Sequence, residues 1–330
     1  MAGPGDEGSG EDRLIARFFK PLATAPGALA LTDDAAFVAP PPGCDLVLTT
    51  DMIVGGVHFL PDDPAEMIAR KAMRVNLSDL AAKGATPLGF LVSLALPRDI
   101  DETWLAGFAA GLKADADAYR CPLYGGDTTR TPGPVTVSVT MAGTLPSGRM
   151  VKRAGAKAGD RVYVSGTIGD AALGLVVQQD GTRKLSDTAR KHLIDRYRLP
   201  QPRNALAEAV RTHASAAMDV SDGLAGDLAK LCRVSGVAAR IEAGRVQLSD
   251  AARELIASDA ALLEAAITGG DDYEIVCTIP ADKVSSFEKA AAAAGVAVTA
   301  IGEIASGQGL DLRGPDGAPM KLRRASFSHF

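Results

Sequence analysis

The sequence predicts a mixed α/β (α+β) protein of two domains, and three observations support this prediction. A chain of 330 residues with 47% hydrophobic residues is longer than the segment that usually shares one hydrophobic core. Segments with strand-like periodicity alternate with segments of helical periodicity in both halves of the chain. The alternation restarts near 155–160, so we expect domains at 11–154 and 155–330 behind a flexible, glycine-rich tail at 1–10.

In the first half, apolar residues at helical spacing are separated by β-prone apolar runs. Leu14, Ile15 and Phe18 fall on one face of a short helix. Asp63 and Pro64 form a typical N-cap and first-turn pair for a longer helix. We therefore expect helices at 14–19, 63–83 and 101–119, and strands at 46–54, 87–96 and 135–142.

The second half repeats this alternation with shorter segments. Its strands are expected at 161–165, 216–220, 273–279 and 296–304. Its helices are expected at 169–179, 223–235 and 283–294, with two further helical stretches before about 213. The sequence shows no short-period repeat, which argues against a solenoid.

Composition and charge exclude several classes of function. A net charge of −5 and a pI near 5.5 disfavour broad nucleic-acid binding, which usually needs a basic face. The first residues lack the pattern of a signal peptide, and no apolar run is long enough to span a bilayer. The four cysteines are far apart and form no C-x-x-C motif, which indicates reduced thiols. We expect a cytoplasmic protein without a membrane or nucleic-acid partner.

Five segments place aspartate beside glycine, serine or threonine, several of them directly after an apolar run. Magnesium prefers oxygen ligands, usually one or two carboxylates together with phosphates and water. Such aspartates on short loops at strand ends can hold several Mg²⁺ ions against a polyphosphate. Any one of these segments also fits a turn or a helix cap, so the prediction depends on their number. The segments are Thr32-Asp-Asp-Ala-Ala36, Thr49-Thr-Asp51, Asn76-Leu-Ser-Asp79, Gly125-Gly-Asp-Thr128 and Asp219-Val-Ser-Asp-Gly223.

The common nucleotide and hydrolase motifs do not explain this pattern. The chain contains no G-x-x-x-x-G-K-[ST] loop, no H-E-x-x-H and no G-x-S-x-G. Gly3, Gly5 and Gly8 match G-x-G-x-x-G, but no strand precedes them, so we regard the match as accidental.

Taken in order, the aspartate segments and their flanks resemble the thiamine-monophosphate kinases. The resemblance runs from about Glu11 to Phe330, and single motifs recur in the wider superfamily of aminoimidazole-ribonucleotide synthetase, selenophosphate synthetase and hydrogenase-maturation proteins. Its most specific parts are Val57-His-Phe59, Asn76-Leu-Ser-Asp-Leu-Ala-Ala82 and Ser328-His-Phe330. Further matching segments are Lys152-Arg-Ala-Gly-Ala-Lys-Ala-Gly-Asp160, Met218-Asp-Val-Ser-Asp-Gly-Leu224 and Gly269-Gly-Asp-Asp-Tyr-Glu274.

The resemblance implies an aminoimidazole-ribonucleotide-synthetase-like fold. In such proteins a β-rich N-terminal half pairs with its copy in a second subunit to close a shared barrel. An α/β C-terminal half covers the N-terminal half, and the active site lies in the cleft between them. We therefore expect a homodimer.

The resemblance also implies an activity, the ATP-dependent phosphorylation of thiamine monophosphate to thiamine diphosphate with several Mg²⁺ ions. This is the last step of thiamine diphosphate biosynthesis, and we expect direct in-line transfer because no residue stands out as a covalent nucleophile. By resemblance, the metal ligands are Asp34, Thr49, Thr50, Asp51, Asp79, Asp127, Asp219 and Asp222. The implied ATP contacts are Gly126, Asp127, Arg153 and Ser221, and the implied contacts of thiamine monophosphate are His58, Asp271 and Phe327.

Some of these residues also have ordinary structural explanations. His58 could satisfy a backbone group, Arg153 could be a surface arginine, and Phe327 could pack in a core. At Asp271 the chain departs from the family, whose segment reads Gly-Gly-Glu-Asp-Tyr-Glu, so the carboxylate here is one methylene shorter.

Other activities on the same scaffold remain as alternatives. Selenophosphate synthetase needs a reactive cysteine or selenocysteine in its N-terminal segment, and here the first cysteine is Cys44. A hydrogenase-maturation protein is expected to end in cysteine, whereas this chain ends in Phe330. Aminoimidazole-ribonucleotide synthetase is the enzyme runner-up on fold alone. A non-catalytic nucleotide-binding regulator would be expected to lack metal ligands.

Overall fold

The computed structural model describes residues 10–320, 322 and 323 and confirms the mixed α/β class. It divides the chain into two compact units. The N-terminal unit runs to Asn76 and includes Pro87–Thr144. The C-terminal unit combines Leu77–Thr86 with the chain from Leu145 onward. The domain bounds expected from the sequence, 11–154 and 155–330, stay a prediction.

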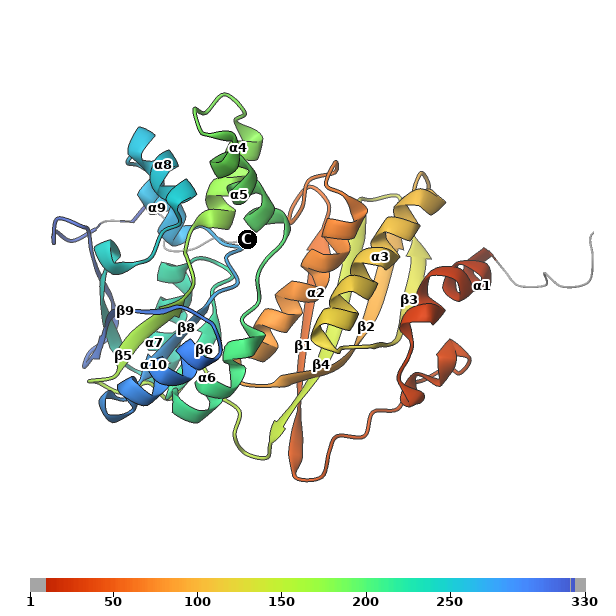
Figure 1. Ribbon diagram of the computed structural model, residues 1–330, viewed down its shortest axis with the longest axis horizontal. Helices are drawn as coiled ribbons and strands as arrows, with labels where there is room; N and C mark the ends of the chain where they lie inside the picture. Colours follow the sequence, from red (N-terminus) through yellow and green to blue (C-terminus); the bar gives the residue numbers. More distant parts are fainter. Residues whose placement is uncertain (1–9, 321, 324–330) are drawn as a thin grey trace, which may run out of the picture. The chain divides into compact units, whose positions relative to one another are not determined.

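The N-terminal unit is built on a four-stranded sheet. The order is β1 (Cys44–Val54), β4 (Thr136–Pro146), β2 (Thr86–Leu96) and β3 (Leu123–Arg130), with β2 and β3 parallel. Before β1 the chain forms α1 (Gly10–Leu14), a π-helical turn (Ile15–Phe19) and two 3₁₀ segments (Lys20–Leu22 and Pro26–Leu31). Helices α2 (Ala65–Ala82) and α3 (Glu102–Tyr119) lie across one face of the sheet (Figure 1).

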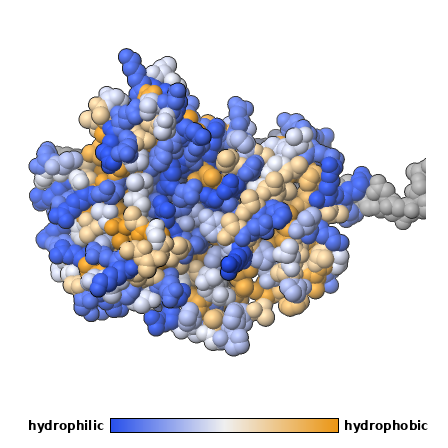
Figure 2. Space-filling model, in the orientation of Figure 1, coloured by the Kyte–Doolittle hydropathy of each residue, from blue (hydrophilic) through white to orange (hydrophobic). Residues whose placement is uncertain are grey.

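This sheet is covered on one face and open on the other. Strand residues alternate between the two faces, and in β2 Phe90, Val92 and Leu94 are buried on the side of the helices. On the other face Leu48 of β1 is 69% exposed and Leu91 of β2 is 43% exposed. Figure 2 looks onto the helix side, where blue hydrophilic residues are interspersed with smaller orange patches. The open face is thus an apolar surface that the unit does not cover.

A close helix contact and a buried ion pair hold α2 against α3. Gly111 brings α3 so near to α2 that an added Cβ would lie 2.3 Å from the carbonyl oxygen of Glu66. Asp115 of α3 is fully buried and accepts hydrogen bonds from Arg70 Nε at 3.2 Å and Arg74 Nε at 2.7 Å. A buried carboxylate of this kind is tolerated because it is paired.

The C-terminal unit is built on a six-stranded sheet. Only the edge pair β10–β7 is parallel, whereas each of the other neighbouring pairs is antiparallel. The order is β10 (Gly309–Arg313), β7 (Ala238–Glu242), β9 (Val298–Ala305), β5 (Arg161–Ser165), β8 (Ile275–Ile279) and β6 (Ala216–Asp219).

Helices pack on both faces of this second sheet. On one face Leu228 of α7 (Leu224–Ser235) belongs to a buried cluster with Val164 and Ile301. On the other face Phe287 of α10 (Val284–Ala293) is buried with Tyr163, and α6 (Ala207–His213) contributes to the same cluster.

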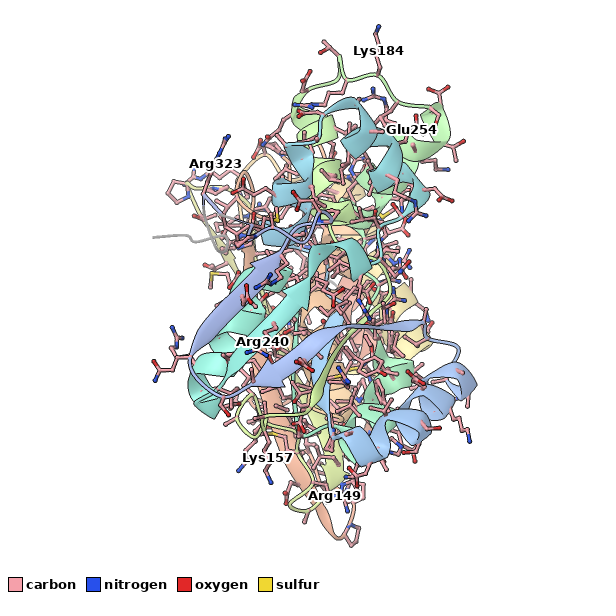
Figure 3. All side chains as sticks on the ribbon, turned by 90° about the vertical axis from the view of Figure 1, so that its left-hand side faces the viewer. Arg149, Lys157, Lys184, Arg240, Glu254 and Arg323 are labelled. Carbon is pink, nitrogen blue, oxygen red and sulfur yellow. The ribbon has the colours of Figure 1, made fainter. Side chains whose placement is uncertain are left out.

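A third buried cluster joins the remaining helices of this unit. It contains residues of α4 (Asp170–Gln179), α5 (Asp187–Arg198), α8 (Asp250–Ser258) and α9 (Leu262–Thr268). Figure 3 looks onto β7, β9 and β10 with Arg240, and the labels of Lys184 and Glu254 mark the end at which α4, α5 and α8 lie. Short 3₁₀ turns occupy Asn204–Leu206, Ala243–Arg245 and Ala281–Lys283.

The structure corrects several expectations from the sequence. The expected strand at 46–54 and helix at 63–83 already contain Thr49-Thr-Asp51 and Asp79, as the structure does, but Gly125-Gly-Asp-Thr128, expected on a loop, lies inside β3. The carboxylate of Asp63 accepts a hydrogen bond from the Leu60 N–H at 2.8 Å, and its expected role as the N-cap of α2 stays a prediction. The strand expected at 273–279 begins only at Ile275, because Tyr273 has a left-handed φ of 51°. Among the described residues, no helix combines the length and apolar character needed to cross a membrane.

Candidate active site

The N-terminal unit contains a cavity of about 750 Å³ on the open side of its sheet. The segment that carries Asp34 and the strand that carries Gly126 and Asp127 both contribute to its lining, together with the apolar Leu48 and Leu91. A cavity of this size, with an apolar floor and a few polar groups, suits a small-molecule ligand. Three residues predicted to bind metal or ATP therefore line one cavity.

Strand geometry determines which side chains reach this cavity. Gly126 has no room for a side chain, because an added Cβ would lie 1.8 Å from the carbonyl oxygen of Val92. Thr50 lies on the same side of β1 as Leu48, and its hydroxyl lies 3.0 Å from that of Thr140. Thr49 and Asp51 belong to the opposite side of β1 by strand alternation. The predicted Thr-Thr-Asp ligand set is thus divided between two faces.

His58 has a structural bond as well as its predicted binding role. Its Nδ1 accepts a hydrogen bond from the Val54 N–H at 3.1 Å, and its carbonyl accepts one from Lys71 Nζ at 2.8 Å. Because Nδ1 acts as the acceptor, the neutral ring carries its proton on Nε2. The structure therefore fixes the tautomer in which Nε2 is the donor.

The C-terminal unit gathers a second group of carboxylates. Burial raises the pKa of Asp219 well above its usual range, and the nearby charges of Asp79 and Asp227 raise this pKa further. Lys83 donates a hydrogen bond to the carbonyl of Ala217 at 2.7 Å. Burial lowers the pKa of Lys83 to about 8, although the charge of Asp219 opposes this shift. Carboxylates that repel each other in this way favour a nearby cation.

Asp227 fixes the loop that carries two of the predicted site residues. Its buried Oδ2 accepts hydrogen bonds from the backbone N–H groups of Ser221 at 3.0 Å and Asp222 at 2.8 Å. Lys230 bonds to Asp227 Oδ1 at 2.8 Å and also to the carboxylate of Asp222. Sequence reasoning missed Asp227, Lys230 and Lys83. For Asp227 and Lys230 a signal existed, since they lie three residues apart on the helix that follows the Asp219-Val-Ser-Asp-Gly223 segment.

Arg153, predicted to contact ATP, is exposed at the start of the C-terminal unit. Its carbonyl accepts a hydrogen bond from Ser235 Oγ at 3.2 Å. Its positive charge contributes to the lowered pKa of Lys83, after the larger effect of burial. Arg153 therefore belongs to the same electrostatic neighbourhood as Asp79 and Asp219.

The loop with Asp271 is strained and tightly held. Asp271 and Tyr273 have left-handed φ values of 72° and 51°, a conformation that costs roughly 1–3 kcal/mol for a non-glycine residue. The N–H of Asp271 donates to the carbonyl of Ser221 at 2.9 Å, and the hydroxyl of Tyr273 donates to Asp271 Oδ1 at 3.3 Å. Backbone strain of this kind tends to occur at functional sites. Phe327, the third predicted substrate contact, lies outside the described residues.

The carboxylates of the C-terminal unit fit a magnesium role. Asp79, Asp219 and Asp222 offer the hard oxygen donors that Mg²⁺ prefers. Burial raises the pKa of Asp219, and the charges of Asp79 and Asp227 raise it further, so a bound cation would favour its ionised form. Within the described residues, no three histidine, cysteine, aspartate or glutamate side chains form a ready metal cage. Magnesium often takes one or two carboxylates and completes its shell with water and phosphate, so this arrangement agrees with the ion.

Comparison with known proteins places the chain in a family. Residues 32–145 match the family "AIR synthase related protein, N-terminal domain", and residues 157–314 match the corresponding C-terminal domain. The thiamine-monophosphate kinase of Caulobacter vibrioides is 44% identical over 314 residues, covering 93% of this chain and 88% of the relative.

Two solved structures extend this likeness to three dimensions. The crystal structure of thiamine-monophosphate kinase from Stenotrophomonas maltophilia superimposes with a TM-score of 0.83 at 39% identity, covering 94% of this chain and 96% of the other. The structure of AaThiL complexed with AMPPCP and TMP has a TM-score of 0.78 at 32% identity, covering 90% and 91%. The chain therefore belongs to the thiamine-monophosphate kinase family.

Proposed function

We propose that this protein is a kinase that uses ATP to phosphorylate thiamine monophosphate to thiamine diphosphate, the last step of thiamine diphosphate biosynthesis. The observation that carries the proposal is the electrostatic coupling of Asp79 and Asp227 with the buried Asp219, where Asp227 also fixes the loop that carries Asp222. This group lies in a chain whose relatives at 31–44% identity are thiamine-monophosphate kinases.

We assign the residues of the two units to three tasks. When bound, Mg²⁺ supplies the positive charge that stabilises a transferring phosphoryl group. The proposed ligands of several such ions are Asp34, Thr49, Thr50, Asp51, Asp79, Asp127, Asp219 and Asp222. Gly126, Asp127, Arg153 and Ser221 would hold ATP, and His58, Asp271 and Phe327 would hold thiamine monophosphate.

The chain's own groups suit direct in-line transfer. Phosphoryl transfer depends mainly on positioning and on charge stabilisation, so a covalent intermediate is not required. The planar guanidinium of Arg153 can form a bidentate pair of hydrogen bonds with a phosphate. His58 can donate from Nε2, because Nδ1 is occupied by the Val54 N–H.

We further propose that the protein works as a homodimer in the cytoplasm. The support for a dimer is the open face of the N-terminal sheet, where Leu46, Leu48, Met52 and Leu91 are between 41% and 69% exposed. A second copy of the chain would cover this apolar surface. The support for the cytoplasm is that all four cysteines are free thiols, as expected in a reducing compartment.

The test of the function is ATP consumption with Mg²⁺ and thiamine monophosphate, with thiamine diphosphate as the measured product. We expect product only when ATP, thiamine monophosphate and Mg²⁺ are all present, and none after EDTA removes the metal. Replacing thiamine monophosphate by thiamine should abolish ATP consumption. ATP hydrolysis that is independent of the acceptor would contradict the proposal, and so would the binding of ATP without turnover.

The role of Asp271 has its own test. Its carboxylate is one methylene shorter than the glutamate of the family, a difference of about 1.5 Å in reach. A bridging water would fill this gap at little cost, so Asp271→Glu should keep turnover within a few-fold of wild type. Asp271→Ala should raise the KM for thiamine monophosphate and leave the KM for ATP unchanged. If Asp271→Ala changes neither constant, Asp271 is a structural residue of the loop and not a substrate contact.

A further inference from the structure

A buried cluster of charges lies directly behind the loop that carries Asp271. Glu274 is fully buried, and its two oxygens accept four hydrogen bonds. The donors are Ser165 Oγ at 2.6 Å, Arg196 Nη2 at 3.0 Å, Arg203 Nε at 2.6 Å and Arg203 Nη2. Because each partner is a donor, an ionised carboxylate is the side chain that satisfies them all.

The residues around Glu274 hold its side chain in a single position. Gly166 has no space for a side chain, since an added Cβ would lie 2.3 Å from Glu274 Oε1. The hydroxyl of Ser165 also accepts a hydrogen bond from the Ile275 N–H at 2.8 Å, which fixes the start of β8. The cluster therefore sets where the chain leaves the loop and enters the sheet.

Backbone hydrogen bonds through Val220 connect Glu274 to the loop that carries Asp271. The carbonyl of Glu274 accepts a hydrogen bond from the Val220 N–H at 2.8 Å, and the Tyr273 N–H donates to the Val220 carbonyl at 2.8 Å. Asp272 accepts hydrogen bonds from the Gly169 N–H at 2.9 and 2.8 Å, so the loop is also tied to the start of α4. These bonds hold Tyr273 and Asp271 in left-handed conformations that they would otherwise avoid.

We propose that Glu274, held by Arg196 and Arg203, is a positioning residue that orients Asp271 toward the acceptor substrate. This inference rests on the proposed function, in which Asp271 contacts thiamine monophosphate. Because Glu274 is fully buried, it acts through the loop and not by direct contact with the substrate. It acts by keeping the strained loop in the one conformation in which the Tyr273 hydroxyl and the Ser221 carbonyl hold Asp271.

The N-terminal unit offers a matched control for this role. Asp115 is also a fully buried carboxylate held by two arginines, Arg70 and Arg74, but it joins two helices and supports no strained loop. Both Glu274→Gln and Asp115→Asn replace a carboxylate by an amide that presents N–H groups to arginine donors. Both variants should therefore lose stability. Only Glu274→Gln should change the KM for thiamine monophosphate.

The experiment compares wild type, Glu274→Gln and Asp115→Asn by thermal unfolding and by steady-state kinetics with each substrate varied in turn. We expect both variants to unfold at a lower temperature than wild type. In Glu274→Gln the KM for thiamine monophosphate should rise by about 10- to 100-fold, as expected when a binding group is displaced by about 1 Å. The KM for ATP should stay within about twofold. Asp115→Asn should leave both constants unchanged.

A milder variant covers the case in which Glu274→Gln does not fold. Arg203→Lys keeps the charge but loses the planar fork that spans both oxygens of Glu274. It should raise the KM for thiamine monophosphate in the same direction by a smaller factor. The inference would be overturned if the KM for thiamine monophosphate is unchanged in the folded Glu274 and Arg203 variants, or if it rises equally in Asp115→Asn. Either result would leave the proposed function standing. A wild-type protein that does not phosphorylate thiamine monophosphate would overturn the proposed function, and this inference with it.

Discussion

The two units of this protein differ in how many faces of the sheet are covered by helices. In the N-terminal unit helices cover one face, and the other face keeps Leu48 and Leu91 exposed. In the C-terminal unit helices pack on both faces, and each face has its own buried cluster. A sheet with one apolar face left open is incomplete by itself, whereas a sheet covered on both faces is not. The comparison supports the proposal that a second copy of the chain covers the open face of the N-terminal sheet.

The predicted site residues also differ between the two units in how exposed they are. In the N-terminal unit Asp34, Gly126 and Asp127 line an open cavity on the uncovered face. In the C-terminal unit the predicted Asp219 is buried, as is Asp227, which was not predicted and which backbone and lysine bonds hold in place. We infer that the C-terminal carboxylates are positioned by their own unit. The surroundings of the N-terminal group would be completed only when a second copy covers the open face.

Removing one carboxylate from each unit should give the largest effect. Asp79→Asn keeps the shape of the side chain but removes a full negative charge. Since electrostatic stabilisation at such a site contributes several kcal/mol, turnover should fall by about 10²-fold or more. Asp127→Asn in the N-terminal cavity should produce a loss of similar size if both groups serve one reaction. Turnover at saturating Mg²⁺ is the measurement.

The control for this pair is Asp117→Asn, which changes an exposed aspartate of α3 paired with Lys113. It should keep wild-type turnover. Near-normal turnover in Asp79→Asn would show that this carboxylate is structural. A loss in Asp79→Asn alone would show that the N-terminal cavity does not contribute metal ligands.

The open sheet face can be tested by adding a charge. Leu48→Lys places a lysine at a position that is 69% exposed in the single chain and that a second copy would bury. Burial of a leucine contributes about 1.5–3 kcal/mol, so its loss in both copies should shift the protein strongly toward monomer. Val234→Lys is the matched control, because Val234 is 49% exposed but lies on α7 of the C-terminal unit.

Sedimentation or light scattering over a range of concentrations would measure this shift. We expect wild type and Val234→Lys to be dimers and Leu48→Lys to dissociate. Equal behaviour of the two lysine variants would contradict the role assigned to the open face.

A smaller effect is expected at Arg153, which is exposed at the surface of the C-terminal unit. Arg153→Lys keeps the charge but loses the fork that can bind two phosphate oxygens. ATP use should weaken by roughly 1–3 kcal/mol, the contribution of a charge-assisted hydrogen bond. Steady-state kinetics with ATP varied would measure it, and Arg149→Lys, a nearby exposed arginine, serves as the control. Unchanged constants in Arg153→Lys would reject the assignment.

Much of the fold could be predicted from the sequence because most elements carry a clear apolar period. Helices α2 and α3 and strand β2 lie within a few residues of their expected bounds. Strand β3 was missed, since its sequence Leu-Tyr-Gly-Gly-Asp-Thr-Thr-Arg has almost no apolar residues. It forms because β2 supplies a parallel neighbour, with Gly126 paired to Val92. Tertiary pairing of this kind leaves little local signal.

The site was predicted less completely than the fold, for a physical reason. Aspartates such as Asp79 and Asp222 stand out in the sequence because they occur in short polar segments. Asp227, Lys230 and Glu274 support those segments, and a local spacing is visible only for Asp227 and Lys230, whose partners lie within eight residues. The pairing of Glu274 with Ser165 spans 109 residues, so no local pattern could indicate it.

The smallest expected effect concerns pH and a histidine on the outer side of the C-terminal unit. His213 lies beside Phe287, with Nδ1 3.3 Å from Ser286 Oγ. Partial burial lowers the pKa of His213 in the folded protein, and the charge of Lys283 lowers it further. The unfolded chain therefore binds a proton more readily than the folded chain. The stability contributed by neutral His213 is complete above the unfolded pKa of about 6.5 and is lost as the pH falls through the lower folded value.

His213→Gln should lose less stability than wild type between pH 7.5 and pH 5, because both proteins share every other titrating group. Thermal unfolding at several pH values would measure the difference between the two Tm values. A difference that stays constant with pH would show that His213 titrates alike in the folded and unfolded chain.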